Sequence, residues 1–503
     1  MYSRIRSAVC AGVEGKEVFV ETDITRGLPS VSVVGLASTT VMESKERIKN
    51  AILNSGFEYP RSRVTINLVP ADLKKNSSCL DLPMAMGILV SEMPACPDDL
   101  NEFAVVGELT LDGRINAVRA ALPMLMDMKK KGVKKVVVPT LNACEALMAG
   151  IDEVYAAERL IDAMEIIINP MGRDLFMVKE TDGADDSKDE VCAFDFKDVN
   201  GQENAKRAIL IAAAGRHGLL MVGSPGCGKT MLAGRIPGIL PAMSERELTE
   251  VAVIRSLTGP AAALSSPVRP FRHPHHTIGR AGLLGGGTNI ALPGEITLAH
   301  NGVLFLDEIC EFDRHNIDGL RIPLEEKRIS HFRRGETYTY PCDFQLVMAS
   351  NPCPCGFYGD KEKECTCSQA DIERYQNKLS GPIMDRIDMK ISMERVTYTE
   401  LTSKRSGMSS SDMRSSLNRA HSFACSMGRT GYNSDLTAFE MEKHLQLGAD
   451  EKSFMKRAYE ALSMSPRSYV RTLKVARTIA DLSESVEIKE EHLAEALSYR
   501  VPS

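Results

Sequence analysis

Short apolar runs alternate with amphipathic stretches through most of the chain, and amphipathic stretches alone fill its last part. In residues 1–172, the apolar runs at 31–34, 64–69 and 136–138 have the length and composition of β-strands. Between them, stretches such as 43–54 carry apolar side chains at helical spacing. This pattern predicts a mixed α/β domain over residues 1–172.

A polar segment and a second α/β region follow. Six of the twelve residues 179–190 are acidic, so we predict a solvated linker over residues 173–193 that buries too little apolar surface to fold. Residues 194–395 again alternate strand-like and helix-like stretches. The apolar runs at 303–306 and 346–349 are typical of strands that a parallel sheet buries on both faces. An α/β core is therefore predicted over residues 194–395.

Residues 396–503 show helical patterning only. Ser465 followed by Pro466 is typical of the start of a helix, with serine as the cap and proline in the first turn. An apolar stripe at helical spacing comes next, formed by Leu473, Ala476, Ile479 and Ala480. We predict a C-terminal helical domain over residues 396–503.

The composition limits which classes of function fit this chain. The net charge is −6 and the pI is about 6.0, so any nucleic-acid contact must come from a local basic patch. The absence of Trp and the 5% of aromatic residues argue against single-strand binding by base stacking. The thirteen cysteines are an odd number and most are scattered singly, which fits reduced thiols better than a disulfide framework. With no secretory stretch and no run of 18 apolar residues, we expect a cytoplasmic protein without membrane spans.

The most informative motif is a glycine-rich loop between a strand-like run and a helix-like stretch. It consists of Gly223, Ser224, Pro225, Gly226, Cys227, Gly228, Lys229 and Thr230. The glycines let backbone amides approach a triphosphate, and the start of the next helix adds partial positive charge. Lys229 is positioned to reach the outer phosphates, and the Thr230 hydroxyl to bind magnesium. The motif predicts binding of a nucleoside triphosphate.

Polar side chains follow two of the predicted core strands. Asp307 and Glu308 come directly after the run 303–306, where parallel sheets place their ligands. Asp307 is suited to hold magnesium and Glu308 to polarise the attacking water. Asn351 follows the run 346–349 and is our candidate for sensing the γ-phosphate, the alternative being a polar residue at a strand end.

Two arginines are candidates for the charge that phosphoryl transfer requires. Arg386 lies between Asp385 and Asp388, so it is either a guanidinium offered to the nucleotide of a neighbouring subunit or a partner of these acids. Arg467 lies in the first turn of the helix that Ser465 opens, where it is expected either to contact the nucleotide or to face solvent.

Together these segments resemble one family. Residues 223–230, 303–308, 349–352, 381–388 and 465–482 resemble the magnesium-chelatase-like branch of the AAA+ ATPases and, more narrowly, the ComM/YifB family. The resemblance covers nearly the whole chain. It implies an AAA+ P-loop NTPase core, with a parallel sheet and helices on both faces, followed by a C-terminal helical lid. Residues 20–29 and 34–36 resemble the N-terminal domain of this family, which implies the α/β fold of the Lon protease domain.

The resemblance assigns roles to the candidate residues. Lys229 and Thr230 take the Walker A role, and Asp307 and Glu308 the Walker B role, with ATP and magnesium as ligands. The sensor 1, arginine-finger and sensor 2 roles fall on Asn351, Arg386 and Arg467, respectively. The family also implies ATP hydrolysis in a homo-oligomeric ring, expected to be a hexamer.

The N-terminal domain lacks the residues of a Lon-type peptidase. Ser77 and Ser78 lie near the position of the Lon serine, but the surrounding Lon-type glycine loop is missing. Leu122 stands about where the catalytic lysine belongs. Because a serine without a base is merely polar, we expect a scaffold or a substrate-contact module rather than a protease.

Four cysteines lie within fifteen residues. Cys353, Cys355, Cys365 and Cys367 form two C-x-C pairs separated by nine residues. This spacing favours a tetrahedral zinc site, with free thiols and disulfides as the alternatives. The cluster comes directly after Asn351, so a metal here would fix the loop beside the nucleotide.

A basic hairpin is the candidate contact with the substrate. Residues 327–340 read as two alternating strands around a turn that carries Arg333 and Arg334, and the corresponding hairpin of related helicases points into a central pore. Arginines at its tip are suited to contact DNA phosphates. We therefore expect a ring-forming DNA motor that acts as a branch-migration or helicase-type factor in recombination or transformation. A protein remodeller or protease component, and a magnesium-chelatase-type metal-insertion subunit, are the alternatives.

Overall fold

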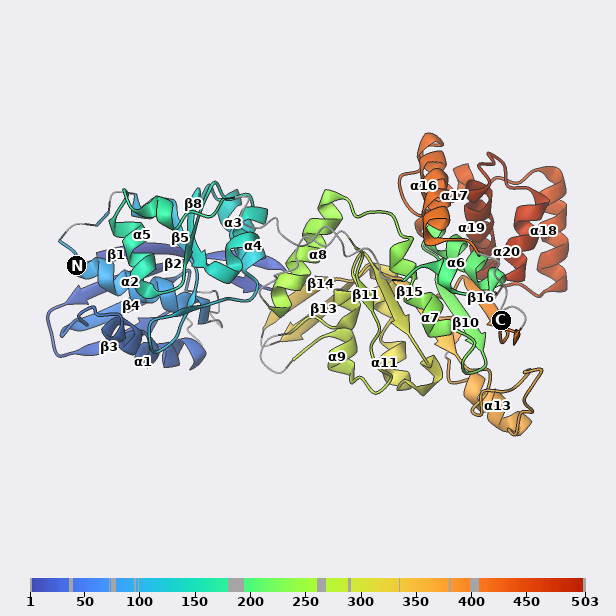
Figure 1. The fold of residues 1–503 in the computed structure, drawn as a ribbon, viewed down its shortest axis with the longest axis horizontal. Coiled ribbons are helices and arrows are strands. Elements are labelled where there is room, and N and C mark those ends of the chain that lie inside the picture. The colour runs from blue at the N-terminus through green and yellow to red at the C-terminus, as the bar shows by residue number, and fades with distance from the viewer. Residues whose placement is uncertain are drawn as a thin grey trace. The chain divides into compact units, whose positions relative to one another are not determined.

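The computed structural model describes residues 2–35, 39–71, 73, 78–94, 96–97, 99–179, 194–259, 268–287, 291–333, 335–379, 381–398 and 407–500. They form two compact units (Figure 1). The first unit comprises Met1–Asp189, Leu248–Ser266 and Arg334–Thr339, and the second comprises Glu190–Glu247, Pro267–Arg333 and Tyr340–Ser503. Of the predicted core region, the described residues 248–259 and 335–339 therefore belong to the first unit. Most of the predicted linker (180–193) lies outside the described residues.

The first unit is built on a mixed sheet of seven strands. These are β1 (Tyr2–Ala11), β2 (Glu14–Thr25), β3 (Ser30–Val34), β4 (Arg63–Val69), β5 (Phe103–Val105), β8 (Lys135–Pro139) and β9 (Glu153–Ala157), in the order β3-β4-β2-β1-β5-β8-β9. Strand β2 is antiparallel to both β1 and β4, whereas β5, β8 and β9 run parallel to β1. The short strands β6 (Glu108–Leu109) and β7 (Ile115–Asn116) pair antiparallel. The apolar runs at 31–34, 64–69 and 136–138 thus lie in strands, as predicted.

Helices cover this sheet. They are α1 (Thr39–Asn54), α2 (Asp81–Glu92), α3 (Ala121–Lys130), α4 (Ala143–Met148) and α5 (Leu160–Ile168). Helix α2 is buried along almost its whole length against β1 and β2. The helix α8 (Glu245–Thr258), most of which belongs to this unit, packs Ala252 against Leu122.

The second unit is built on a parallel sheet of five strands. These are β10 (Leu219–Gly223), β11 (Phe271–Arg272), β12 (Val303–Leu306), β15 (Gln345–Ser350) and β16 (Met389–Met393), in the order β11-β12-β15-β10-β16. Strand β15 lies between β10 and β12, so the polar residues that follow these three strands meet at one edge of the sheet. The strand order reverses beside β10, the kind of place where such sheets bind ligands.

Both faces of this sheet are buried. Along β12, Val303 and Phe305 belong to one apolar cluster, whereas Leu304 and Leu306 belong to another on the opposite face. Side chains of a strand alternate between faces, so two covered faces explain the unbroken apolar run. Helices on both faces, as the family resemblance implied, complete the layered α/β arrangement.

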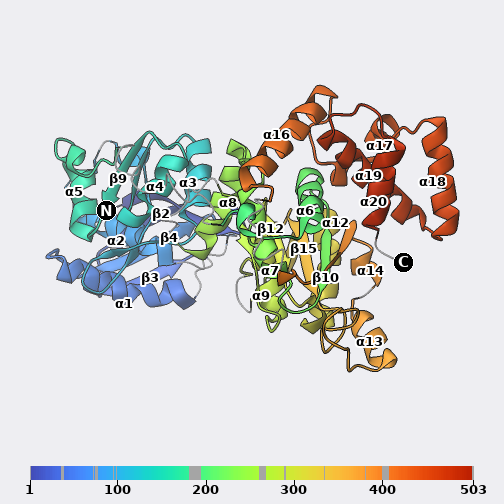
Figure 2. The ribbon, with the colours of Figure 1, turned by 45° about the vertical axis from the view of Figure 1, so that its right-hand side comes forward.

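Along the chain, the helices of the second unit come before, between and after the strands of the sheet. Those within the sheet region are α6 (Glu203–Gly215), α7 (Lys229–Ala233), α9 (Arg280–Leu284), α10 (Glu295–Leu298), α11 (Arg314–Asp318), α12 (Arg321–Glu326), α13 (Gln369–Gln376) and α14 (Gly381–Met384). The last five are α16 (Ser410–Ser426), α17 (Ala438–His444), α18 (Ala449–Ala461), α19 (Pro466–Leu482) and α20 (Glu490–Ser498). Figure 2 shows these five gathered as one helical group, with α16 and α19 packing against α6.

Two local predictions are confirmed. Helix α19 begins at Pro466, and the Ser465 side chain accepts a hydrogen bond from the backbone N–H of Ser468. The strands β13 (Arg328–Arg333) and β14 (Glu336–Pro341) form the predicted hairpin, although Arg334 at its turn lies outside the described residues. Among the described residues, no helix combines the length and apolarity that a membrane crossing requires.

Candidate active site

The glycine-rich loop connects the carboxyl end of β10 to α7. Gly226 and Gly228 have φ values of +82° and +95°, a left-handed backbone that side chains other than glycine rarely adopt. Cys227 between them is buried, with 2% of its surface exposed, and so anchors the loop in the core. The turn therefore has the tight backbone that a phosphate-binding loop requires.

Lys229 is held inside this loop. Its Nζ donates to the backbone carbonyls of Gly223 at 2.6 Å and Ser224 at 3.2 Å. The same amine donates to Asn351 Oδ1 at 3.2 Å, although 122 residues separate the two in sequence. Lys229 and Asn351 thus meet at the carboxyl edge of the sheet, as the adjacent positions of β10 and β15 require.

Two oxygen ligands converge beside this lysine. The Thr230 hydroxyl donates to Asp307 Oδ2 at 2.5 Å. A hydroxyl and a carboxylate side by side, next to a loop shaped for phosphates, are a donor set that suits Mg²⁺. Thr230 and Asp307, which were predicted from the sequence as magnesium ligands, therefore fit that ion.

Glu308 has an unusual backbone and a partner that the sequence did not predict. Its φ of +51° is left-handed, which is uncommon outside glycine and is found at functional sites. Its carboxylate lies 3.5 Å from Nδ1 of His276. His276 in turn contacts His275, with ring centroids 4.2 Å apart and the rings tilted by 32°. The loop that carries His273, His275 and His276, here called the histidine loop, thus lies beside the candidate catalytic carboxylate.

The four clustered cysteines are arranged as metal ligands. Their sulfur atoms all lie within 4.8 Å of one another, and Cys353 Sγ is 3.3 Å from Cys355 Sγ and 3.7 Å from Cys365 Sγ. A disulfide requires about 2.05 Å, whereas a tetrahedral zinc site with Zn–S bonds of about 2.3 Å places its sulfurs close to the separations seen here.

Backbone donors point at sulfurs of this cluster and favour the thiolate form of Cys355, whereas the pKa values of Cys365 and Cys367 are raised. The N–H of Cys355 donates to Cys367 Sγ at 3.4 Å, and the N–H of Tyr358 donates to Cys353 Sγ at 3.3 Å. Hydrogen bonds from the backbone at Phe357 and Thr366 lower the pKa of Cys355 to about 6. The donor set fits Zn²⁺, which the four cysteines would hold as a closed structural site.

This cysteine loop packs on the phosphate loop. The Ser224 hydroxyl donates to Asp360 Oδ2 at 2.5 Å, and this contact is the main reason why the pKa of Asp360 falls to about 2. A methyl group added at Gly356 would lie 2.7 Å from Cδ of Pro225, so the backbone at Gly356 is in close contact with the proline ring. Ordering of the cysteine loop therefore also orders the phosphate loop.

We expect the purified protein to contain about one zinc ion per chain, because the four sulfurs form one closed site. Cys355→Ser should lose the metal and melt at least about 5 °C lower, since structural zinc contributes directly to folding. Metal analysis and thermal denaturation measure both effects. Cys425→Ser, which removes an exposed thiol of α16, is the matched control and should change neither. A zinc-free protein whose Cys355→Ser variant melts normally would contradict the assignment.

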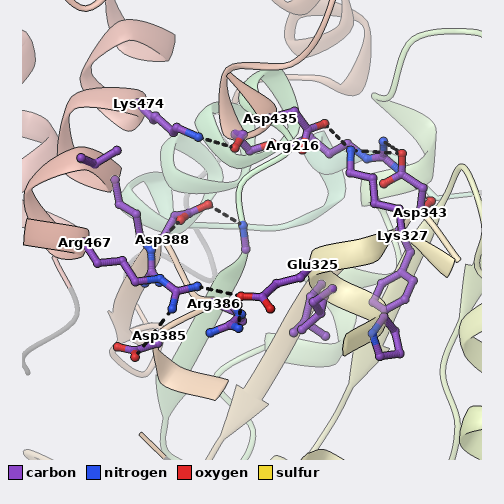
Figure 3. Close-up of a pocket in the computed structure, with 18 of the residues that line it drawn as sticks. Arg216, Glu325, Lys327, Asp343, Asp385, Arg386, Asp388, Asp435, Arg467 and Lys474 are labelled. Atoms are coloured by element: carbon purple, nitrogen blue, oxygen red, sulfur yellow. Dashed lines mark hydrogen bonds and ion pairs between the residues drawn. The ribbon is translucent and has the colours of Figure 1, made fainter. Parts of the chain in front are cut away.

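The two candidate arginines lie at the opposite edge of the sheet. Arg386 is near the amino end of β10. Asp388, two residues further along the chain, donates its N–H at 3.1 Å to the carbonyl of Gly218, the residue directly before this strand. Both Arg386 and Arg467 line a cavity of about 540 Å³ that Gly218 also lines (Figure 3). The phosphate loop begins at the other end of this strand, about 16 Å away at 3.3 Å per residue. The structure therefore does not bring either arginine to the nucleotide loop of its own chain.

The basic side chains of the hairpin and of strand β11, which precedes the histidine loop, differ in exposure and in their partners. Arg333 is exposed at the end of β13, and its Nε donates to the Gly287 carbonyl at 2.9 Å. Phe332 beside it is 67% exposed, an aromatic side chain that our sequence analysis had not singled out. Arg272, by contrast, forms an ion pair with Glu295 at 2.6 Å and has a structural role.

Sequence reasoning missed two partners at the nucleotide edge, Asp360 and His276, and one at the opposite edge, Glu325. Asp360 lies 136 residues from Ser224, and Glu325 lies 61 residues from its partner Arg386. Both are acids in polar stretches, which is the ordinary signature of a solvated surface. No pattern in the sequence distinguishes such acids from their neighbours.

Family models match almost the whole chain. "Magnesium chelatase, subunit ChlI" matches residues 195–401, "Subunit ChlI of Mg-chelatase" matches residues 20–142, and "Magnesium chelatase, subunit ChlI C-terminal" matches residues 407–500. Known proteins of this family form an AAA+ ATPase-like group.

Individual relatives match over the full length. The chain is 38% identical to competence protein ComM of Haemophilus influenzae, covering 99% of this chain and 97% of that protein. It is also 38% identical to the uncharacterized protein YifB of Salmonella typhimurium, covering 99% and 96%. A shorter similarity, 28% identity over 130 residues, links 25% of the chain to 23% of Lon protease 2 of Bacillus subtilis.

Proposed function

The chain belongs to the magnesium-chelatase-like family that includes ComM and YifB, and on this basis we propose that it is a ring-forming AAA+ ATPase that acts on DNA. The proposed activity is ATP hydrolysis coupled to movement along DNA, of the branch-migration or helicase type. A role in recombination or natural transformation is supported by the name of the competence relative.

The carboxyl edge of the sheet supplies the chemistry of hydrolysis. Lys229 would exchange its contacts with the Gly223 and Ser224 carbonyls for the outer phosphates of ATP. Thr230 and Asp307 would hold magnesium, which neutralises charge on the phosphates when it is bound. Glu308 would accept a proton from the attacking water, and Asn351, hydrogen-bonded to Lys229, would orient that water.

The single observation that carries the proposal is the separation of these groups from the two arginines. Phosphoryl transfer benefits from a guanidinium at the γ-phosphate, but Arg386 and Arg467 lie at the amino edge of the same sheet. Two copies placed head to tail bring the amino edge of one to the carboxyl edge of the next. Head-to-tail contacts that close on themselves make a ring, which supports a homo-oligomer of the proposed hexameric kind.

The exposed hairpin supports DNA as the substrate. Arg333 offers a cation for phosphates, and Phe332 offers an aromatic face on which a base can stack. Since Arg333 is tied to the loop at Gly287, two loops of the unit present one surface. The low aromatic content argued against binding by base stacking, so Phe332 is a local exception to that expectation. Phe332 also favours a second candidate, a protein remodeller, because exposed aromatic side chains suit the gripping of an unfolded polypeptide.

The N-terminal unit is proposed to be a Lon-like domain without peptidase activity. The partial similarity to Lon protease 2 supports this relationship. Ser78 donates its hydroxyl to the Glu108 carboxylate, and the buried Leu122 stands where a lysine base would be needed. The unit is accordingly proposed to act as a scaffold or a substrate contact.

A strand-displacement assay tests the proposal. We expect the protein with ATP and magnesium to separate a forked or three-stranded DNA and to hydrolyse ATP faster when DNA is present. Lys229→Ala is the control and should do neither, because it lacks the amine at the phosphates. If an unfolded protein stimulates turnover and DNA does not, the remodeller is the better assignment.

A further inference from the structure

One carboxylate pairs with both arginines of the cavity in Figure 3. Arg386 Nη2 donates to Glu325 Oε1, and Arg467 Nη2 lies 3.6 Å from the same oxygen. Figure 3 shows both side chains directed toward Glu325. Two guanidinium groups that converge on one oxygen form an anion-binding pair, and Glu325 supplies the anion within the chain.

The two arginines need such an anion in order to stay together. Burial lowers the pKa of Arg386, and the positive charge of Arg467 lowers it further. Asp385 is a second acid beside the pair, but its carboxylate lies 4.0 Å from Arg467 and so forms only a long ion pair with that arginine. Without Glu325, mutual repulsion would oppose the arrangement of the guanidinium groups side by side.

Glu325 can leave this cluster more easily than either arginine. Its side chain is 56% exposed, whereas that of Arg386 is 14% exposed. An exposed carboxylate regains its hydration when it moves away, so its ion pair contributes little free energy. A γ-phosphate, with more charge and more acceptor oxygens, would bind the same two arginines more strongly.

Glu325 also lies at the base of the exposed hairpin. It is the second-last residue of α12, and Lys327, with a left-handed φ of +56°, ends the helix. Strand β13 begins at the next residue, Arg328. Lys327 is itself fixed by the N–H of Cys342, which donates to its carbonyl at 2.9 Å. A displacement of the hairpin is therefore transmitted over very few residues to the Glu325 carboxylate.

We propose that Glu325 regulates the arginine pair: its carboxylate holds the place that the γ-phosphate of a neighbouring subunit takes, and a polymer on the hairpin withdraws it. The inference rests on the proposed function and adds to it a link between substrate contact and hydrolysis. In the absence of polymer, Glu325 competes with the phosphate and keeps turnover low. Binding of polymer releases the arginines to the neighbouring site.

The test compares Glu325→Gln with Glu326→Gln, a control that removes the adjacent exposed carboxylate, which pairs with Arg328. We expect Glu325→Gln to raise ATP turnover without DNA about threefold, the effect of removing one exposed ion pair. The factor by which single-stranded DNA stimulates turnover should fall correspondingly. Glu326→Gln should match the unmodified protein. Basal turnover of Glu325→Gln that is unchanged or lower overturns the proposal.

A second variant separates regulation from a general structural effect. In the Arg386→Ala background, Glu325→Gln should cause no further rise, because the carboxylate acts through that arginine. An equal rise in both backgrounds overturns the proposal. If DNA fails to stimulate the unmodified protein, the DNA motor is the assignment that fails, and the basal turnover of Glu325→Gln still decides the role of Glu325.

Discussion

Replacing Arg386 with alanine is expected to lower ATP turnover about 1,000-fold while ATP still binds, because a guanidinium supplied to the γ-phosphate stabilises the transition state by this order. The binding loop is intact in the variant, since Arg386 lies at the far edge of the sheet from Lys229. Phosphate release and binding of a fluorescent ATP analogue measure the two quantities separately.

Mixing two inactive variants tests whether the arginine acts between subunits. Lys229→Ala lacks a working phosphate loop but retains Arg386, whereas Arg386→Ala has the reverse defect. Rings that contain both should regain part of the turnover, because some interfaces combine an intact loop with an intact arginine. Normal turnover by Arg386→Ala alone would remove the residue from the mechanism, and mixtures that stay inactive would argue against action across an interface.

Replacing Glu308 with glutamine is the second change with a large expected effect. The carboxylate is the proposed proton acceptor, and loss of a general base typically reduces the rate about 100- to 10,000-fold. Glutamine keeps the shape of the side chain, so ATP affinity should change less than about twofold. Single-turnover hydrolysis and equilibrium binding are the appropriate measurements.

The matched control for this variant is Glu311→Gln. Glu311 lies three residues further along, and its carboxylate is 3.7 Å from Lys378 and 43% exposed. It should retain normal turnover, because it lies outside the set formed by Lys229, Thr230 and Asp307. An equal loss of turnover in both variants would indicate that any change in the loop after β12 impairs the protein. Glu308 would then no longer be supported as the proton acceptor.

The parts of the site that could be predicted from the sequence are contiguous in the chain. The loop from Gly223 to Thr230 shows its chemistry through glycine spacing, which the structure explains by the left-handed φ of Gly226 and Gly228. The apolar run before Asp307 predicted a strand buried on both faces, and such a strand ends at a ligand-binding edge. The cysteine spacing likewise predicted a cluster, and the sulfurs do converge.

The position of Arg467 could not be predicted in the same way. Its place in the first turn of α19 was correctly indicated by Ser465 and Pro466. Whether the arginine faces its own nucleotide loop depends on how the helical group packs on the sheet. The structure places it beside Arg386 and Glu325 instead, at the amino edge.

By itself, the sequence determined the elements and the chemistry carried by short motifs: the phosphate loop, the acids after β12 and the four thiols. Their signals are local, because backbone conformation and burial on both faces restrict which residues can stand next to one another. Only the tertiary structure decided that Asp360 contacts Ser224 and that Glu325 pairs with both arginines. These contacts join distant segments through side chains that look like ordinary surface acids, and packing alone brings them together.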